Sequence, residues 1–160
     1  MCPKYQMVHR ILHFVKGTLY SRLHFTSHTT LNLSAFSYAD WAGCPSIRRS
    51  TIGYCIFLSK NLISWCLKKQ HTISRSSTKA EIRSMANTTV EITWPTFLLK
   101  DLHIPPITPL VLYYDNLSAL HMTIDLVFHA HSKHIELDYH FVRERVVIGY
   151  LITRHINTNN

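Results

Sequence analysis

Three acidic residues in separate segments are the strongest candidates for chemistry in this chain. Asp40 ends one apolar run, Asp115 ends another, and Glu81 lies near the start of a long helical segment. If the two runs are adjacent parallel strands, their carboxyl ends share one edge of a sheet, where sites tend to form. Converging carboxylates need a cation, because like charges repel, and such oxygen ligands suit Mg²⁺ or Mn²⁺. Two ions about 4 Å apart can activate water and stabilise the leaving oxygen in phosphodiester cleavage.

Each of these acids, taken singly, also has a structural explanation. Asp40 and Asp115 stand where turn or cap residues are common, and Glu81 fits a solvated helix position. Their joint function therefore depends on the elements that would bring them together.

The order of predicted elements is three strands, a helix, a strand, further helices and a last strand. Strands are predicted at residues 31–38, 54–60, 62–69, 109–115 and 150–156, with a tight turn near Lys60-Asn61. Hairpins come first and crossover helices come later, which predicts a mixed five-stranded α/β sheet with helices packed on its faces. Further helices are expected near "LSALHMTI" and over "HIELDYHFVRERVVIG".

Two helical segments carry more detailed predictions. The helix over residues 74–102 is capped by Ser76 or Ser77, and Pro95 should kink or split it. Its predicted buried stripe consists of Ala80, Met85, Val90, Trp94 and Leu98. A shorter helix over residues 4–16, ended by Gly17, places apolar residues at helical spacing.

Composition narrows the class of protein. The 160 residues suit one domain, and a hydrophobic fraction of 46% excludes a disordered chain. No apolar run approaches the ~18 residues of a membrane span, and "MCPKYQMVHR" lacks the apolar block of a signal peptide, so we expect an intracellular protein with no membrane partner. With 17 Lys and Arg against 9 Asp and Glu, the formal charge is +8, which favours nucleic acid as a partner.

Other reactive residue types give weaker signals. The four cysteines match no zinc spacing, and we expect reduced, mostly buried thiols. His129, His131 and His134 form a cluster, but no nearby cysteine completes a four-ligand zinc site. Trp41 and Trp65 can stack on bases, although core positions are the favoured interpretation.

Several long motifs in one order resemble a known family. These are "ADWAGCPSIRRSTIGYCIFL", "ISWCLKKQHTISRSSTKAEIRS", "YYDNLSAL" and "SKHIELDYHFVRERV". Together they resemble the ribonuclease H domain of copia-type retrotransposon Pol polyproteins. "VHRILHFVKGTLYSRLHF" resembles the segment that joins reverse transcriptase to that domain. The resemblance implies a linking remnant over residues 1–30 and a ribonuclease H-like domain over residues 31–160.

The resemblance implies two-metal cleavage of RNA in RNA–DNA hybrids, with four acids holding Mg²⁺ or Mn²⁺. The helix glutamate of the family corresponds to Glu81, and the fourth-strand aspartate corresponds to Asp115. The family's motif has two aspartates at the end of the first strand. The second corresponds to Asp40, but the first, which bridges the metals, corresponds to Tyr38.

Two departures from the family predict a weakened site. Asp40 lies about 6.5 Å beyond Tyr38 at ~3.3 Å per residue, whereas metal–ligand distances tolerate only about 0.2 Å. The fourth acid of the family opens a C-terminal helix, and the sequence given ends before such an element. We therefore expect a degenerate copy that cleaves hybrids inefficiently or not at all.

Nucleic-acid binding is the function we expect to persist. Arg48 and Arg49 lie in a loop, and four further candidates for phosphate contact are Lys68, Lys69, Arg75 and Ser76. Three alternatives stay open: a hybrid-cutting nuclease domain with a reverse transcriptase partner in its parent polyprotein, a non-catalytic nucleic-acid-binding remnant, and a pseudogene product that does not fold.

Overall fold

A computed structural model describes residues 3–27, 31–104, 108–119 and 133–157. The strands are β1 (Leu33–Asp40), β2 (Thr51–Leu58), β3 (Asn61–Lys69), β4 (Leu110–Tyr114) and β5 (Leu151–His155). The helices are α1 (Pro3–Thr18), α2 (Ser77–Asp101) and α4 (Lys133–Val147). Among the described residues, no helix is long and apolar enough to cross a bilayer.

The five strands form one mixed sheet in the order β3-β2-β1-β4-β5. β1 pairs antiparallel with β2 and parallel with β4, and β5 lies parallel to β4. The predicted sheet, including the parallel pairing of the first and fourth strands, is confirmed. The observed strand limits lie within about three residues of the predicted ones, the largest difference being the start of β2 at Thr51 instead of residue 54, and the tight turn lies at Ser59-Lys60.

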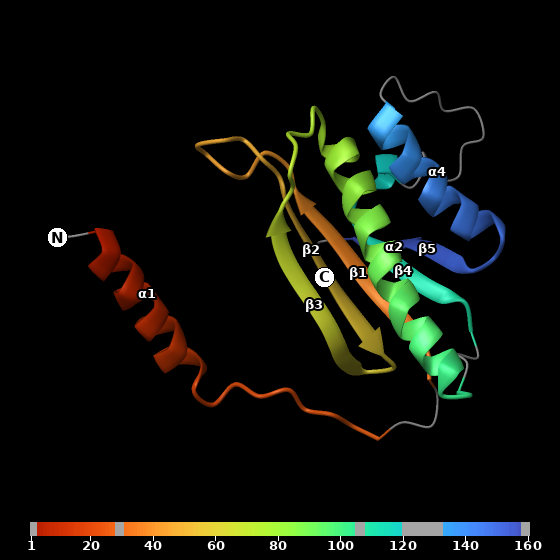
Figure 1. Ribbon diagram of the computed structural model, residues 1–160, viewed down its shortest axis with the longest axis horizontal. Coiled ribbons are helices and arrows are strands. Elements are labelled where there is room, and N and C mark those ends of the chain that lie inside the picture. Colours follow the sequence, from red (N-terminus) through yellow and green to blue (C-terminus); the bar gives the residue numbers. More distant parts are fainter. Residues whose placement is uncertain (1–2, 28–30, 105–107, 120–132, 158–160) are drawn as a thin grey trace.

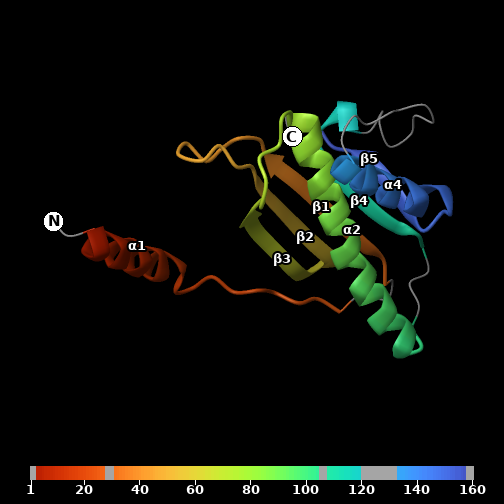
Figure 2. The same cartoon turned by 45° about the horizontal axis from the view of Figure 1, so that its top comes forward.

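Helices α2 and α4 cover the same face of this sheet (Figures 1 and 2). In β1, Leu33, Ala35, Ser37 and Ala39 alternate toward α2 and are buried. They pack with residues from α2, β4 and α4 such as Ile82, Leu112 and Val142. Alternation along β1 therefore places one set of side chains in the core and the other set on the opposite side of the sheet.

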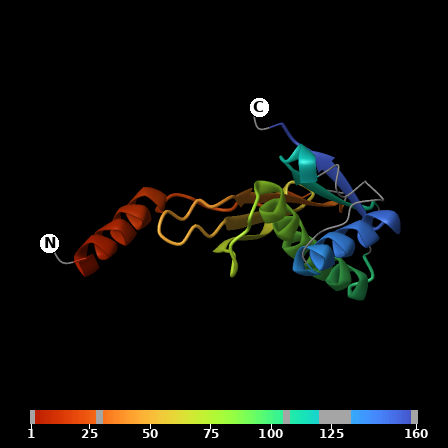
Figure 3. The same cartoon turned by 90° about the horizontal axis from the view of Figure 1, so that it is seen from above.

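No described helix covers that opposite side, which we call the open face (Figure 3). Its members include Phe36, Tyr38, Trp65 and Leu67, which are 40%, 51%, 58% and 74% exposed. The strand register places Trp65 and Phe36 in one row across the sheet, and Leu67 and Tyr38 in the next. The predicted core position of Trp65 is therefore wrong.

Helix α2 departs from its predicted burial. Ala80 and Met85 are buried as expected, but Val90, Trp94 and Leu98 are exposed. Val90 lies on the exposed side of the helix, between the buried Thr89 and Ile92. For Trp94 and Leu98 the reason is length: 25 helical residues extend for about 37 Å, whereas the eight residues of β1 extend for about 26 Å, so the last turns of α2 pass beyond β1 (Figure 1). Pro95 does not split the helix, which continues to Asp101.

The structure also tests several smaller predictions. Trp41 is 48% exposed, and its indole N–H donates to the carbonyl of Ser74 at 2.9 Å, so its predicted core position is wrong. Cys44 is buried, Cys55 and Cys66 are half-buried, and all three are free thiols. The side chains of the three clustered histidines, and most of the predicted "LSALHMTI" helix, lie outside the described residues.

Helix α1 stands apart from the sheet in all three views (Figures 1, 2 and 3). Its apolar side chains are largely exposed, among them Val8, Ile11, Leu12 and Val15. The connecting segment is held at the β2–β3 turn, where the backbone N–H of Thr26 donates to Asn61 Oδ1 at 2.8 Å. The Asn61 amide donates in return to the Thr26 carbonyl at 2.9 Å.

Candidate nuclease-like site

The structure brings four side chains to one edge of the sheet. Tyr38 and Asp40 come from the end of β1, Asp115 directly follows β4, and Glu81 lies in the first turns of α2. Glu81 and Asp115 interact electrostatically. The Tyr38 phenol interacts electrostatically with the carboxylates of Asp40, Asp115 and Glu81. We call these four residues the acidic edge. Three distant segments therefore meet because β1 and β4 are parallel neighbours and α2 crosses above them.

Glu81 is the most enclosed member of the acidic edge. Its side chain is 3% exposed, and Oε1 accepts a hydrogen bond from the backbone N–H of Ala39 at 2.9 Å. Oε2 is also buried and has no hydrogen-bond partner among the described residues. Burial raises the pKa of this carboxyl to about 7, the negative charge of Asp115 adds to the rise, and the Ala39 N–H opposes it.

Tyr38 occupies a well-fixed backbone position but carries an exposed phenol. The Ser84 hydroxyl of α2 donates to the Tyr38 carbonyl at 2.9 Å, and the Ser37 and Ser84 hydroxyls lie 2.9 Å apart. These contacts join β1 to α2, while the phenol points to the open face. Burial and the neighbouring carboxylates Asp40, Asp115 and Glu81 raise the pKa of Tyr38 above its ordinary value of 10.0.

Asp40 and Asp115 end neighbouring strands but differ in surroundings. Asp40 is exposed, and its carboxylate lies against Gly43, where an added Cβ would overlap it. Glycine is therefore needed in this turn to leave room for the Asp40 side chain. Asp115 is half-buried, and its backbone carbonyl lies 2.9 Å from His155 Nε2 at the end of β5.

These residues do not fit a two-ion metal centre. In the part of the chain that the structure describes, no group of three or more Asp, Glu, His or Cys side chains is arranged to hold a metal. One oxygen of Glu81 is already engaged by Ala39, and residue 38 contributes a neutral phenol, not a carboxylate, within electrostatic range of the three acids. Divalent ions of the kind the family uses prefer several carboxylate oxygens, which this edge does not provide.

The predicted nucleic-acid contacts lie around the same end of the sheet. Arg48 and Arg49 are exposed in the loop between β1 and β2, and Arg48 has a positive φ of 51°. Arg75 is exposed just before α2, and Ser76 caps that helix by accepting from the Lys79 backbone N–H at 3.3 Å. The prediction that Ser76 or Ser77 caps the helix thus resolves to Ser76.

Lys68 and Lys69 project to opposite sides of β3. Lys68 pairs with Ile52, which is buried with Ala39 and Ala80 on the α2 side of the sheet. Lys69 alternates to the other side, where its ammonium donates to Cys44 Sγ at 3.3 Å. Hydrogen bonds from Ser46, the Ile47 backbone and Lys69 lower the pKa of the Cys44 thiol to about 6.

Sequence reasoning missed two groups on α2. Ser84 supports the strand that carries Tyr38, and Arg83 bridges two elements beside the acidic edge. Both lie in the quoted motif "KAEIRS". Ser84 follows Glu81 by three residues, a spacing that places the two on the same side of a helix, whereas Arg83, two residues after Glu81, had no such signal.

The strand order, the crossover helices and the acids at the ends of β1 and β4 define a ribonuclease H-like domain. The N-terminal RNase H domain of rv2228c from Mycobacterium tuberculosis superposes with a TM-score of 0.57 at 8% identity, covering 81% of this chain and 84% of that one. LC11-RNase H1 in complex with an RNA/DNA hybrid superposes with a TM-score of 0.54 at 10% identity, covering 79% and 86%. At such identities the likeness establishes the fold.

Sequence comparison gives a more particular result. The retrovirus-related Pol polyproteins from transposons RE1 and RE2 of Arabidopsis thaliana are each 43% identical to this chain, over 155 and 151 residues. These alignments cover 97% and 94% of the chain. The chain belongs to the family of copia-type retrovirus-related Pol polyproteins, as the sequence motifs predicted. It spans 11% and 10% of the length of these two relatives, and no family model matches it.

Proposed function

We propose that this ribonuclease H-like domain binds nucleic acid but is impaired in hydrolysing RNA–DNA hybrids. The observation that carries the proposal is the phenol of Tyr38 at the acidic edge, within electrostatic range of Asp40, Asp115 and Glu81. The family resemblance implies that a metal-bridging aspartate would stand at the position of Tyr38. An Mg²⁺ or Mn²⁺ site is consequently weakened.

The charge available at the acidic edge supports this proposal. The Tyr38 phenol is neutral at pH 7, because its pKa is raised further above 10.0 by burial and by neighbouring carboxylates. Glu81 has a pKa raised to about 7, so it is about half protonated at neutral pH. Asp40 stands two residues beyond the bridging position, against Gly43. The edge therefore presents much less negative charge than two divalent ions need.

Binding of nucleic acid is supported by charge and position. The chain carries a formal charge of +8, and Arg48, Arg49, Lys69, Arg75 and Ser76 surround the same end of the sheet. Basic side chains neutralise backbone phosphates and release counterions, so such binding weakens as salt rises. The LC11-RNase H1 structure contains an RNA/DNA hybrid, and we propose the same class of partner here.

The test uses purified protein and a labelled RNA–DNA hybrid with Mg²⁺ or Mn²⁺. We expect a salt-dependent mobility shift without cleavage. The variant Tyr38→Asp should bind Mn²⁺ about tenfold or more tightly than the native protein in calorimetry, because it adds a carboxylate at the position that the family resemblance assigns to the metal-bridging aspartate. Tyr38→Asn is the matched control of similar size without charge, and it should leave the affinity unchanged.

Three results would contradict this proposal. Cleavage by the native protein that disappears in Glu81→Gln would show an active nuclease. Absence of any hybrid binding at low salt would remove the binding function. Equal Mn²⁺ affinity in Tyr38→Asp and Tyr38→Asn would mean that Tyr38 does not occupy a metal-bridging position.

We further propose that residues 1–30 form the segment joining a reverse transcriptase domain to residues 31–160 in a parent polyprotein. The exposed apolar side chains of α1, such as Ile11 and Leu12, support this division. In a longer protein that includes the reverse transcriptase, hydrogen exchange over α1 should be slower than in residues 1–160 alone. Equal exchange in the two proteins would contradict the proposal.

A further inference from the structure

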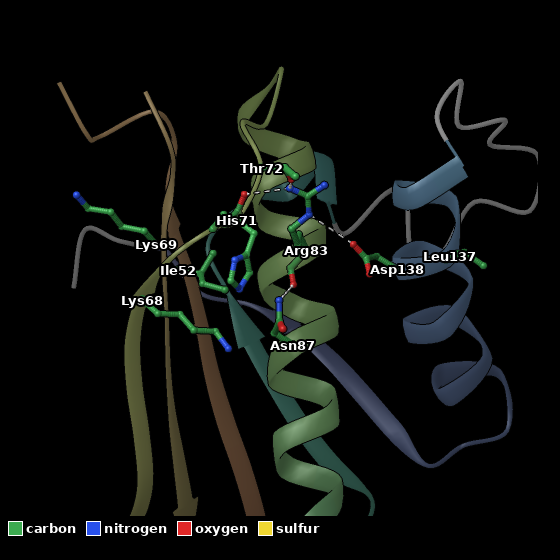
Figure 4. A pocket seen from close by; sticks show the side chains of 10 residues that line it. Ile52, Lys68, Lys69, His71, Thr72, Arg83, Asn87, Leu137 and Asp138 are labelled. Atoms are coloured by element: carbon green, nitrogen blue, oxygen red, sulfur yellow. Dashed lines mark hydrogen bonds and ion pairs between the residues drawn. The ribbon is translucent and has the colours of Figure 1, made fainter. Parts of the chain in front are cut away.

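A groove of about 510 Å³ crosses α2 on the helix-covered side of the molecule, next to the acidic edge (Figure 4). We call it the α2 groove. One wall comes from the end of β3 and the residues after it, the other comes from α4, and α2 forms the floor. Its lining includes Lys68, His71, Thr72, Arg83, Asn87 and Asp138.

Arg83 is held in position at the centre of this groove. Its Nη1 donates to Thr72 Oγ1 at 2.6 Å and to Gln70 Oε1 at 3.5 Å. Its Nε lies 3.7 Å from Asp138 Oδ2 on α4. These contacts leave the Nη2 donors without a partner among the described residues, and a guanidinium fixed in this way loses little entropy when it binds a further acceptor.

Lys68 and His71 add donors from the β3 side. Lys68 projects to the α2 side of the sheet because it pairs with Ile52, and Figure 4 places its side chain and that of His71 facing α2. Both residues are exposed, so their nitrogen atoms can reach a ligand. Lys69 also lines the groove, but its side chain extends away from α2, in keeping with its contact to Cys44.

The chemistry of the lining favours a phosphate group. An ammonium, a guanidinium, an imidazole and a hydroxyl are all groups that bind phosphate oxygens. The carboxylate in the lining, Asp138, already faces Arg83 and therefore orients the guanidinium more than it repels an anion.

We propose that the α2 groove binds a backbone phosphate of a nucleic-acid strand, with Lys68, His71 and Arg83 as its contacts. This inference rests on the proposed nucleic-acid binding and extends it. The bound strand does not end at the acidic edge but continues over α2, where one further phosphate is held. The contact is independent of sequence, because no base edge is needed for it.

The test measures hybrid affinity by fluorescence anisotropy across a series of salt concentrations. Lys68→Gln should weaken binding about threefold to tenfold at 0.1 M salt and lower the slope of log K against log salt by about 1. The matched control is Lys60→Gln, because Lys60 is an exposed lysine in the β2–β3 turn at the far end of the sheet. This control should leave the slope unchanged, and His71→Gln should weaken binding in the same direction as Lys68→Gln.

The possible failures are distinguishable. If Lys68→Gln and Lys60→Gln behave alike while the native protein binds hybrid, the groove proposal is wrong and the proposed function stands. If the native protein binds no hybrid at low salt, both are wrong. If polyglutamate at equal charge competes as well as hybrid and loses the same affinity in Lys68→Gln, the groove belongs to an acidic protein partner.

A free phosphate ion shares the chemistry of a backbone phosphate. A titration of the native protein and of Lys68→Gln with inorganic phosphate, followed by ¹H–¹⁵N NMR, separates the two sources. We expect weak shifts that do not saturate. Saturation below about 1 mM phosphate, lost in Lys68→Gln, would assign the groove to the free ion and overturn the proposal.

Discussion

The two halves of α2 have the same secondary structure but different surroundings. From Ala80 to Ile92, the helix lies across the sheet and buries one side, including the carboxyl of Glu81. From Trp94 onward, large apolar side chains such as Phe97 are exposed, because the helix has passed the end of the sheet. The comparison shows that apolar residues at helical spacing mark burial only where another element lies within reach.

The largest effect that tests this comparison is expected in the core. Ile92→Ala should lower the free energy of unfolding by about 2–5 kcal/mol, because Ile92 is fully buried and the change leaves a cavity. Val90→Ala, two residues away but 57% exposed, should cost no more than about 0.5 kcal/mol. Urea unfolding of both variants gives the measurement, and equal losses would mean that Val90 is covered in solution.

The next effect comes from the buried acid. Because burial raises the pKa of Glu81 from 4.5 to about 7, the folded protein holds a proton that the unfolded chain releases. The folded state therefore loses stability as the pH rises from about 4.5 to about 7, by roughly 3 kcal/mol in total at 1.36 kcal/mol per pH unit. Above that range the loss is complete and constant.

Glu81→Gln isolates this contribution. The amide oxygen can still accept the Ala39 N–H, but the side chain no longer ionises. As the pH rises from 4.5 to 7, the native protein should lose stability relative to Glu81→Gln, so the unfolding free energy of the variant minus that of the native protein should increase. Parallel stability curves over that range would place Glu81 in a solvated environment instead.

Pro95 sharpens the comparison with an effect of opposite sign. A proline within a helix has no N–H to donate and crowds the preceding turn. Pro95→Ala should therefore raise the free energy of unfolding by about 1–3 kcal/mol, measured by urea unfolding. Lys100→Ala, at an exposed position in the same half of α2, is the control, and its change in the free energy of unfolding should be near zero. A destabilised Pro95→Ala variant would contradict this view and indicate that the ring itself packs against a partner.

The smallest expected effect concerns the first turn. Ser76→Ala should lower stability by about 1 kcal/mol, because the Ser76 hydroxyl accepts from the Lys79 N–H and caps α2. Ser77→Ala removes a hydroxyl from the adjacent exposed residue and should change stability by a few tenths of a kcal/mol at most. If Ser77→Ala loses more stability than Ser76→Ala in thermal unfolding, Ser77 is the cap in solution.

Much of the fold was predictable because local patterns and topology agree. Hairpin strands followed by crossover helices restrict the sheet to few arrangements, and the parallel pairing of β1 with β4 follows from them. The meeting of Glu81 with Asp115 could be expected from the same topology. Proximity of residues that far apart in sequence needs only the correct strand order.

The environment of each side chain was less predictable. Trp41 and Trp65 were expected in the core because large aromatics are usually buried, but their location depends on which face of the sheet a helix covers. Consecutive residues of a strand point to opposite faces, but which of Lys68 and Lys69 faces α2 follows from the register of β3 with β2, which the sequence does not specify. The α2 groove requires three elements to meet and has no local sequence signature.

The open face has a practical consequence for anyone handling residues 1–160. Two neighbouring rows of aromatic and aliphatic side chains, which include Phe36, Trp65 and Leu67, are exposed to water in the native state. Dyes such as anilinonaphthalene sulfonate fluoresce on surfaces of this kind, so a strong signal from the purified protein does not indicate a molten globule. Loss of the near-ultraviolet circular dichroism bands is the better criterion for unfolding.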